Sequence, residues 1–241
     1  IFIKIRREQI TCFFQIIDNI MPKITQIFNK EEIMSLFKRK EIHLKFLKDG
    51  FLTIHDIASF YGLKNPKLAF FYPEFLNFPN EYPMVIQNSK QSQKHRDVIE
   101  YFTTHKSTDD DPRISAGNFD TLSLIIQKDD IENFQQFVSH NEIKIQSHKI
   151  EITSFESNKC LNQSSVYLIE YAAYHCSLKI FKFLMMNNAS FSKNLLRYSI
   201  CGGNNEIIHM SESATNEISL HQGQNDILSM SIAFHRYSIT E

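Results

Sequence analysis

The chain has 241 residues, of which 42% are hydrophobic and 12% aromatic, and this composition excludes a disordered tail. Its formal net charge of -1 gives no overall field that favours nucleic acid or an anionic membrane. The four cysteines lack C-x-x-C spacing, and no apolar run reaches the roughly 18 residues that span a bilayer. We therefore expect a cytoplasmic protein with reduced thiols that binds neither nucleic acid nor membrane. Because the chain starts at Ile1, a missing N-terminal segment stays an open alternative.

The first predicted element covers residues 10–28, where apolar side chains recur at steps of three and four. This spacing predicts one amphipathic helix, or two helices divided near Pro22. Such a stripe normally faces the protein's own core. The alternative is a helix that binds a membrane surface or a partner.

Two capping boxes follow. Asn29 with Glu32 and Thr53 with Asp56 have the required three-residue spacing and predict that helices begin directly after Asn29 and Thr53. Further short helices are predicted at residues 42–47, from Pro66 onward and at residues 97–102, with a loop or irregular region over residues 77–95.

The segment 103–115 is the predicted domain boundary. It contains the acidic triplet 109–111 followed by Pro112, which lacks the ligand spacing of a calcium loop and indicates a solvated linker. Residues 1–115 are therefore expected to form a helical N-terminal domain, and residues 116–241 a second domain.

The second domain contains a helix-pair pattern that recurs about four times. Ile126, Ala173, Ile200 and Ile232 occupy equivalent positions, 47, 27 and 32 residues apart, and the chain end truncates the last pair. The longest spacing includes an expansion at residues 146–165, which either recognises a partner or covers the repeat edge. At its start Ile143, Ile145, Ile150 and Ile152 alternate with polar residues, which predicts an extended hairpin within residues 143–155. Ser211 stands where a buried Leu is usual, so looser packing is expected beyond Met210.

The clearest pair, residues 166–190, resembles an ankyrin repeat. Residues 167–170 (YLIE) stand where the family has Thr-Pro-Leu-His, residues 172–173 at its alanine pair, and residues 188–189 at its Gly-Ala. The pair departs from the family at Cys176, where a turn Gly is usual, and at Glu170, which replaces a His that joins a hydrogen-bond network. More narrowly, residues 168–184 followed by residues 195–210 resemble a divergent ankyrin family expanded in parasitic protists of the trichomonad type, and this resemblance covers most of the chain.

This resemblance implies an all-α fold, an ankyrin-like helical solenoid preceded by the α-helical N-terminal domain. It implies a non-catalytic protein-protein interaction module whose concave face binds a protein partner. The first helices and loop tips line that face in the family. The matching partner-binding positions are Tyr167, Glu170, Tyr174, Arg197 and Cys201, with the long loop near His148.

Motifs for chemistry are absent from the sequence. It has no phosphate-binding loop and no nucleophile elbow, and adjacent residues such as His175 and Cys176 point apart rather than forming a dyad. We expect no catalytic residue, metal, cofactor or small-molecule ligand. The alternatives are a structural or decaying family member without a specific partner, and an enzyme with an unrecognised site in the N-terminal domain.

Overall fold

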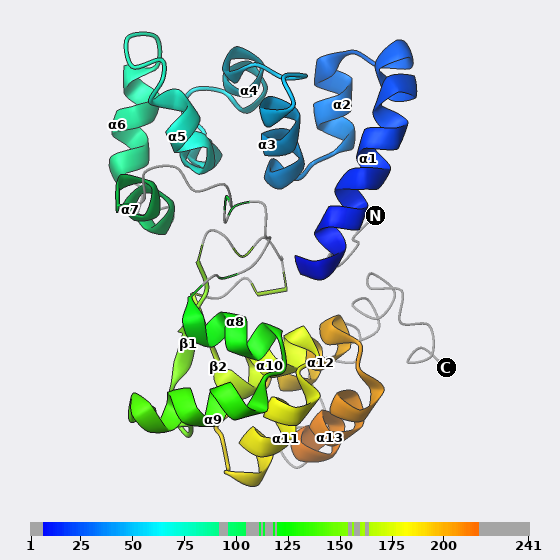
Figure 1. Cartoon of the computed structure of the whole chain (residues 1–241), viewed down its shortest axis with the longest axis vertical. Helices are drawn as coiled ribbons and strands as arrows, with labels where there is room; N and C mark the ends of the chain where they lie inside the picture. The colour runs from blue at the N-terminus through cyan, green and yellow to red at the C-terminus, as the bar shows by residue number, and fades with distance from the viewer. Residues whose placement is uncertain are drawn as a thin grey trace. The chain divides into compact units, whose positions relative to one another are not determined.

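The computed structural model describes residues 7–91, 96–104, 111, 113, 118, 120–153, 156, 160–161 and 164–216. These residues are mostly helical, as the sequence predicts, with a single pair of short strands among them (Figure 1). The chain divides into two compact units. The N-terminal unit holds Ile5–Gly117 and Thr153–Ser157, and the C-terminal unit holds Asn118–Ile152 and Asn158–Glu241 together with Ile1–Lys4.

The N-terminal unit consists of helices that pack around a phenylalanine-rich core. In order these are α1 (Arg7–Ile27), α2 (Lys30–Leu36), α3 (Lys40–Lys48), α4 (Ile54–Tyr61), the 3-10 helix η1 (Pro66–Phe71), α5 (Tyr72–Phe75), α6 (Pro83–Gln91) and α7 (Arg96–Thr104). Helix α1 continues through Pro22, so the single-helix alternative is the correct one.

Both predicted capping boxes are confirmed. The Asn29 side chain accepts a hydrogen bond from the Glu32 amide at 3.0 Å, and the Glu32 carboxylate accepts one from the Asn29 amide at 2.9 Å. Thr53 and Asp56 make the same reciprocal pair at 3.2 and 2.8 Å. These bonds satisfy amides that a helix leaves without an internal partner, which is why α2 and α4 begin where they do.

Two predictions for this unit are wrong. Residues 83–91 form α6 rather than a loop, because Pro83 suits the first position of a helix and Val85 and Ser89, one turn apart, are buried. Residues 111 and 113 are not a solvated linker. The Arg113 side chain is 1% exposed, and its guanidinium lies 2.6 Å from carboxylate oxygens of both Glu74 and Asp111.

The described residues of the C-terminal unit form three helix pairs and the two strands. Its elements are α8 (Thr121–Gln127), α9 (Ile131–His140), β1 (Lys149–Glu151), β2 (Ser165–Tyr167), α10 (Leu168–His175), α11 (Leu178–Met186), α12 (Leu195–Gly202) and α13 (Asn205–Asn216). Helix α10 packs against both α8 and α12, while α11 packs against α9 and α13 (Figure 1). The predicted fourth pair lies outside the described residues.

Each pair turns through one residue in the left-handed region. These residues are Asp129 (φ 54°), Cys176 (φ 61°) and Gly203 (φ 85°), which end α8, α10 and α12. They are 47 and 27 residues apart, so the backbone turns recur at the first two spacings predicted from the sequence. Cys176 therefore adopts the conformation for which the ankyrin family uses glycine.

The strands do not form the predicted hairpin. β1 pairs antiparallel with β2, placing Ile150 opposite Val166, and the Ile152 amide donates to the Ser164 carbonyl at 2.8 Å. The partner of β1 thus comes from the far end of the insertion and not from residues 143–145. The expectation of loose packing after Met210 is also wrong, because Ser211 is fully buried with its Oγ 2.7 Å from Ser199 Oγ.

Candidate functional site

The residues predicted to bind a partner separate into buried and accessible groups. Glu170 is 1% exposed, and Tyr174 and Cys201 are 0% exposed. Side chains buried to this degree cannot line a binding surface, so the prediction is corrected for these three. Tyr167, Arg197 and His148 are partly exposed and remain accessible.

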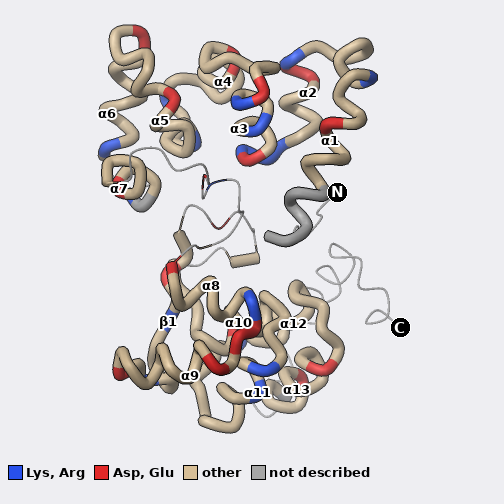
Figure 2. The backbone as a smooth tube through the Cα atoms, viewed as in Figure 1, with Lys and Arg blue, Asp and Glu red and all other residues tan. Residues whose placement is uncertain are grey.

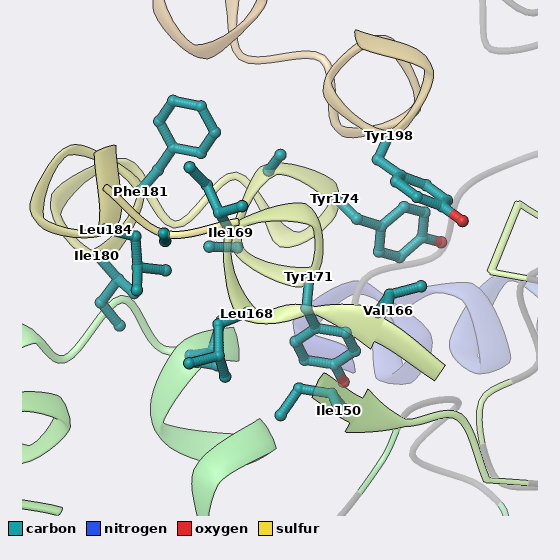
Figure 3. Packing of buried hydrophobic residues seen from close by; sticks show 14 of the residues in the cluster. Ile150, Val166, Leu168, Ile169, Tyr171, Tyr174, Ile180, Phe181, Leu184 and Tyr198 are labelled. Atoms are coloured by element: carbon teal, nitrogen blue, oxygen red, sulfur yellow. The ribbon is translucent and has the colours of Figure 1, made fainter. Parts of the chain in front are cut away.

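Helix α10 is buried because other parts of the same unit cover it. Every residue from Leu168 to Tyr174 is buried. Ile150 of β1 lies beside the ring of Tyr171 (Figure 3), whose hydroxyl accepts a hydrogen bond from Gln127 Nε2 at 2.9 Å. Leu161, from the insertion between the strands, belongs to the same core cluster. Ile150, Cys160 and Leu161 of the insertion therefore pack on the repeats, in line with one of the two roles considered for it.

The Glu170 carboxylate is fully occupied within the protein. One oxygen accepts from the Tyr167 amide at 3.0 Å, and the other accepts from the amide and hydroxyl of Ser192 at 2.8 and 2.5 Å. A buried carboxylate is stable only when hydrogen bonds replace its water. Glu170 thus links the start of α10 to the turn before α12, and its role is structural.

The first and second pairs are also joined at their turns. The Asp129 carboxylate accepts from the amides of Lys179 and Ile180 at 3.1 and 3.0 Å, which caps α11 from outside that helix. The Ser177 hydroxyl donates to the Ile126 carbonyl at 2.5 Å. These bonds fix the stacking of successive pairs through groups that sequence periodicity alone does not reveal.

The accessible residues lie at one end of the first helices. Tyr167 is the N-cap of α10, and the ammonium of Lys149, its partner across the strands, lies 4.5 Å from the centre of its ring. His148 directly precedes Lys149. Arg197 is in the first turn of α12, which packs alongside α10. The accessible edge therefore consists of one tyrosine ring with two cations and an imidazole.

His175 and Cys176 have roles in the fold. The imidazole of His175 packs on the rings of Tyr171 and Tyr174, with centroids 4.4 and 4.9 Å apart. Cys176 occupies the left-handed turn. Within the described residues no group of His, Cys, Asp or Glu could hold a metal ion. No described helix is both long enough and apolar enough to cross a membrane.

A shallow groove lies on the outer face of the first pair. It is lined by Thr121, Ile125, Asn133, Gln136, Phe137, His140 and Asn141. Forty-seven positions later, Leu168 and Ile180 occupy the places of Thr121 and Asn133, and both are buried on the side that faces the green ribbon of the first pair (Figure 3). Thr121 and Asn133 thus add polar groups to a groove that Ile125 and Phe137 keep largely apolar. The groove is therefore the end of the stack rather than an enclosed ligand pocket.

Among its described residues, the N-terminal unit buries the imidazole of His43 in an apolar setting. His43 is fully buried, with Nε2 3.0 Å from the Met34 carbonyl and Nδ1 2.8 Å from the Tyr61 hydroxyl. A carbonyl only accepts, so Nε2 carries the proton and the tyrosine donates to Nδ1. Burial lowers the pKa of His43 and raises that of Tyr61. Both ring nitrogens are engaged by the fold, which indicates a structural role.

Charges of both signs occur on the described parts of each unit (Figure 2). Comparisons with protein-family models, with curated proteins and with solved structures found no match for the chain. The ankyrin resemblance therefore rests on residues 166–190 and on the spacing of the three turns.

Proposed function

We propose that the chain is a non-catalytic protein-interaction module whose C-terminal unit is an ankyrin-like array of helix pairs. The recurrence of a left-handed turn at Asp129, Cys176 and Gly203 carries this proposal. Helices of seven to twelve residues are marginal alone, and stacking lets each pair bury the apolar face of its neighbour. Arrays of this kind present extended surfaces to protein partners.

The proposed binding surface is the accessible edge formed by Tyr167, Lys149, His148 and Arg197. Tyrosine and arginine are enriched among residues that anchor protein interfaces. The Tyr167 ring is already positioned beneath the Lys149 ammonium, so less side-chain entropy is lost on binding. The partner is a protein. The buried Glu170 supports the edge from behind by accepting a hydrogen bond from the Tyr167 amide.

The test compares proteins captured by the full chain with those captured by a Tyr167→Ala, Arg197→Ala variant, using quantitative mass spectrometry. We expect the captured amount of a reproducible set of proteins to fall at least about tenfold on the variant, which corresponds to a loss of about 1.4 kcal/mol in binding free energy. Met186→Ala is the matched control, because Met186 is 75% exposed on α11. An identical set on the double variant, at unchanged melting temperature, contradicts the proposed surface.

A further inference from the structure

Helix α1 has two adjacent apolar faces, and only one of them packs into the core. Ile17 is 1% exposed, and Phe13, Phe14, Met21 and Ile24 pack against the same cluster. The second face holds Ile16, Ile20 and Ile27, which are 57%, 37% and 74% exposed. Contiguous exposed apolar side chains of this kind mark interaction sites on soluble proteins.

The second face has the spacing of a helix-pairing seam. Ile16, Ile20, Lys23 and Ile27 follow steps of four, three and four, which is the alternation of the two core positions of a coiled coil. Pro22 lies outside these positions. Helix α1 is 21 residues long, so the seam occupies its last three turns within a continuous helix. A second helix could therefore lie along it with side chains interlocked.

The charge in the seam indicates what covers it. Lys23 is exposed, and no acidic side chain of the described residues forms an ion pair with it, while Asp18 on the same helix is bonded to Lys45 at 2.7 Å. A second copy paired in parallel would place Lys23 against its own equivalent. A second copy paired antiparallel about the seam centre would place its Ile20 against Lys23. Neither arrangement supplies an acid, and a single lysine gives little attraction to anionic lipid.

We propose that the α1 seam binds an amphipathic helix of a protein partner that carries an acidic residue opposite Lys23. Apolar side chains of that helix would pack between Ile16, Ile20 and Ile27, and its carboxylate would pair with the lysine at the helix interface. This surface lies on the N-terminal unit, so it extends the proposed function and does not depend on the edge around Tyr167.

The test uses two fluorescein-labelled 21-residue peptides with leucine at the seam positions, one with Glu and the other with Lys at the central seam position. Fluorescence anisotropy with the full chain should show at least tenfold tighter binding of the Glu peptide. Lys23→Glu should reverse that preference, and Ile20→Asp should weaken binding at least tenfold. Met84→Asp, at another exposed apolar position on α6, should leave binding unchanged. Circular dichroism checks that the variants keep their helix content.

Four results overturn the proposal. They are no binding of either peptide at 100 μM, a Glu preference that survives Lys23→Glu, self-association of the chain that Ile20→Asp abolishes, and binding to vesicles of phosphatidylcholine and phosphatidylserine that Ile20→Asp abolishes. The third result would assign the seam to a second copy, and the fourth to a membrane. Loss of capture by the Tyr167, Arg197 variant bears only on the edge surface, so the two proposals fail separately.

Discussion

Gly202 provides a sharp test of how α10 and α12 pack. It lies in the last turn of α12, and a β-carbon added there would be 2.3 Å from the Ala173 carbonyl oxygen and 3.2 Å from that of Tyr174. Both obstacles are backbone atoms of α10, so no side-chain rotation can relieve the overlap. The Ala173 oxygen, or the helix that carries it, must move by about 1 Å to reach an ordinary contact distance.

Two opposing effects set the expected result for Gly202→Ala. In a helix with open space around it, alanine is more favourable than glycine by about 1 kcal/mol. Forcing a methyl group into a close-packed contact typically costs about 1 to 3 kcal/mol, and a backbone obstacle places this site at the upper end. The overlap should therefore prevail, and we expect the free energy of unfolding to fall by about 1 to 2 kcal/mol.

The measurement is urea denaturation of the full chain followed by circular dichroism. With a denaturant slope of about 1 to 1.5 kcal/mol per molar for a unit of this size, the midpoint of the C-terminal transition should fall by about 1 M. Gly62→Ala is a useful comparison, because that glycine has φ 80° and open space, so strain acts there without a clash. If Gly202→Ala instead raised the midpoint, as helix propensity alone predicts, the close approach of α10 and α12 would be refuted.

Three further substitutions test other parts of the structure. Cys176→Gly relieves a left-handed residue and should raise the free energy of unfolding by up to about 1 kcal/mol, whereas Cys176→Val should lower it; a loss on Cys176→Gly in urea melts counts against the turn geometry. Because burial lowers the pKa of His43 below its ordinary 6.5, the His43 imidazole is protonated at a higher pH in the unfolded chain than in the folded chain. Stability should then fall as the pH drops below about 6.5, by at most about 1.4 kcal/mol per pH unit, and urea midpoints between pH 5 and 8 should show this slope reduced in His43→Gln. Arg113→Met removes the guanidinium from Glu74 and from the buried Asp111, which then keeps only the Lys48 ammonium at 2.8 Å, and should lower the stability of the N-terminal unit by up to about 3 to 5 kcal/mol; a thermal melt shifted by less than 2 °C is incompatible with the buried ion pair.

Local signals in the sequence predict most helix starts correctly. The boxes at Asn29 and Thr53 succeed because a cap depends on residues three positions apart, which are close in any conformation that begins a helix. The failure at residues 83–91 has a related cause. Pro83 is a turn signal in general but a good first helical residue in particular, and the two buried positions that support α6 are too few to produce a clear apolar stripe.

Contacts between residues far apart in the chain account for the features that the sequence alone did not predict. The sequence places Tyr174 on a first helix, and periodicity alone does not show that the insertion carrying Leu161 packs into the same core. The hairpin prediction fails likewise, because Ile150 pairs with Val166 from beyond the insertion. Arg113 looks like part of a polar linker until Glu74, far earlier in the sequence, is placed beside it.

Photo-crosslinking through a benzoylphenylalanine introduced at position 167 tests the central claim most directly. The full chain carrying this residue is irradiated in a lysate of cells that produce it, and a second variant carries the same group at position 186, which is also accessible. The account predicts one discrete crosslinked protein at position 167, lost on Arg197→Ala, and none at position 186. Equal crosslinking at the two positions, or none at position 167, would contradict a partner-binding edge on the C-terminal unit.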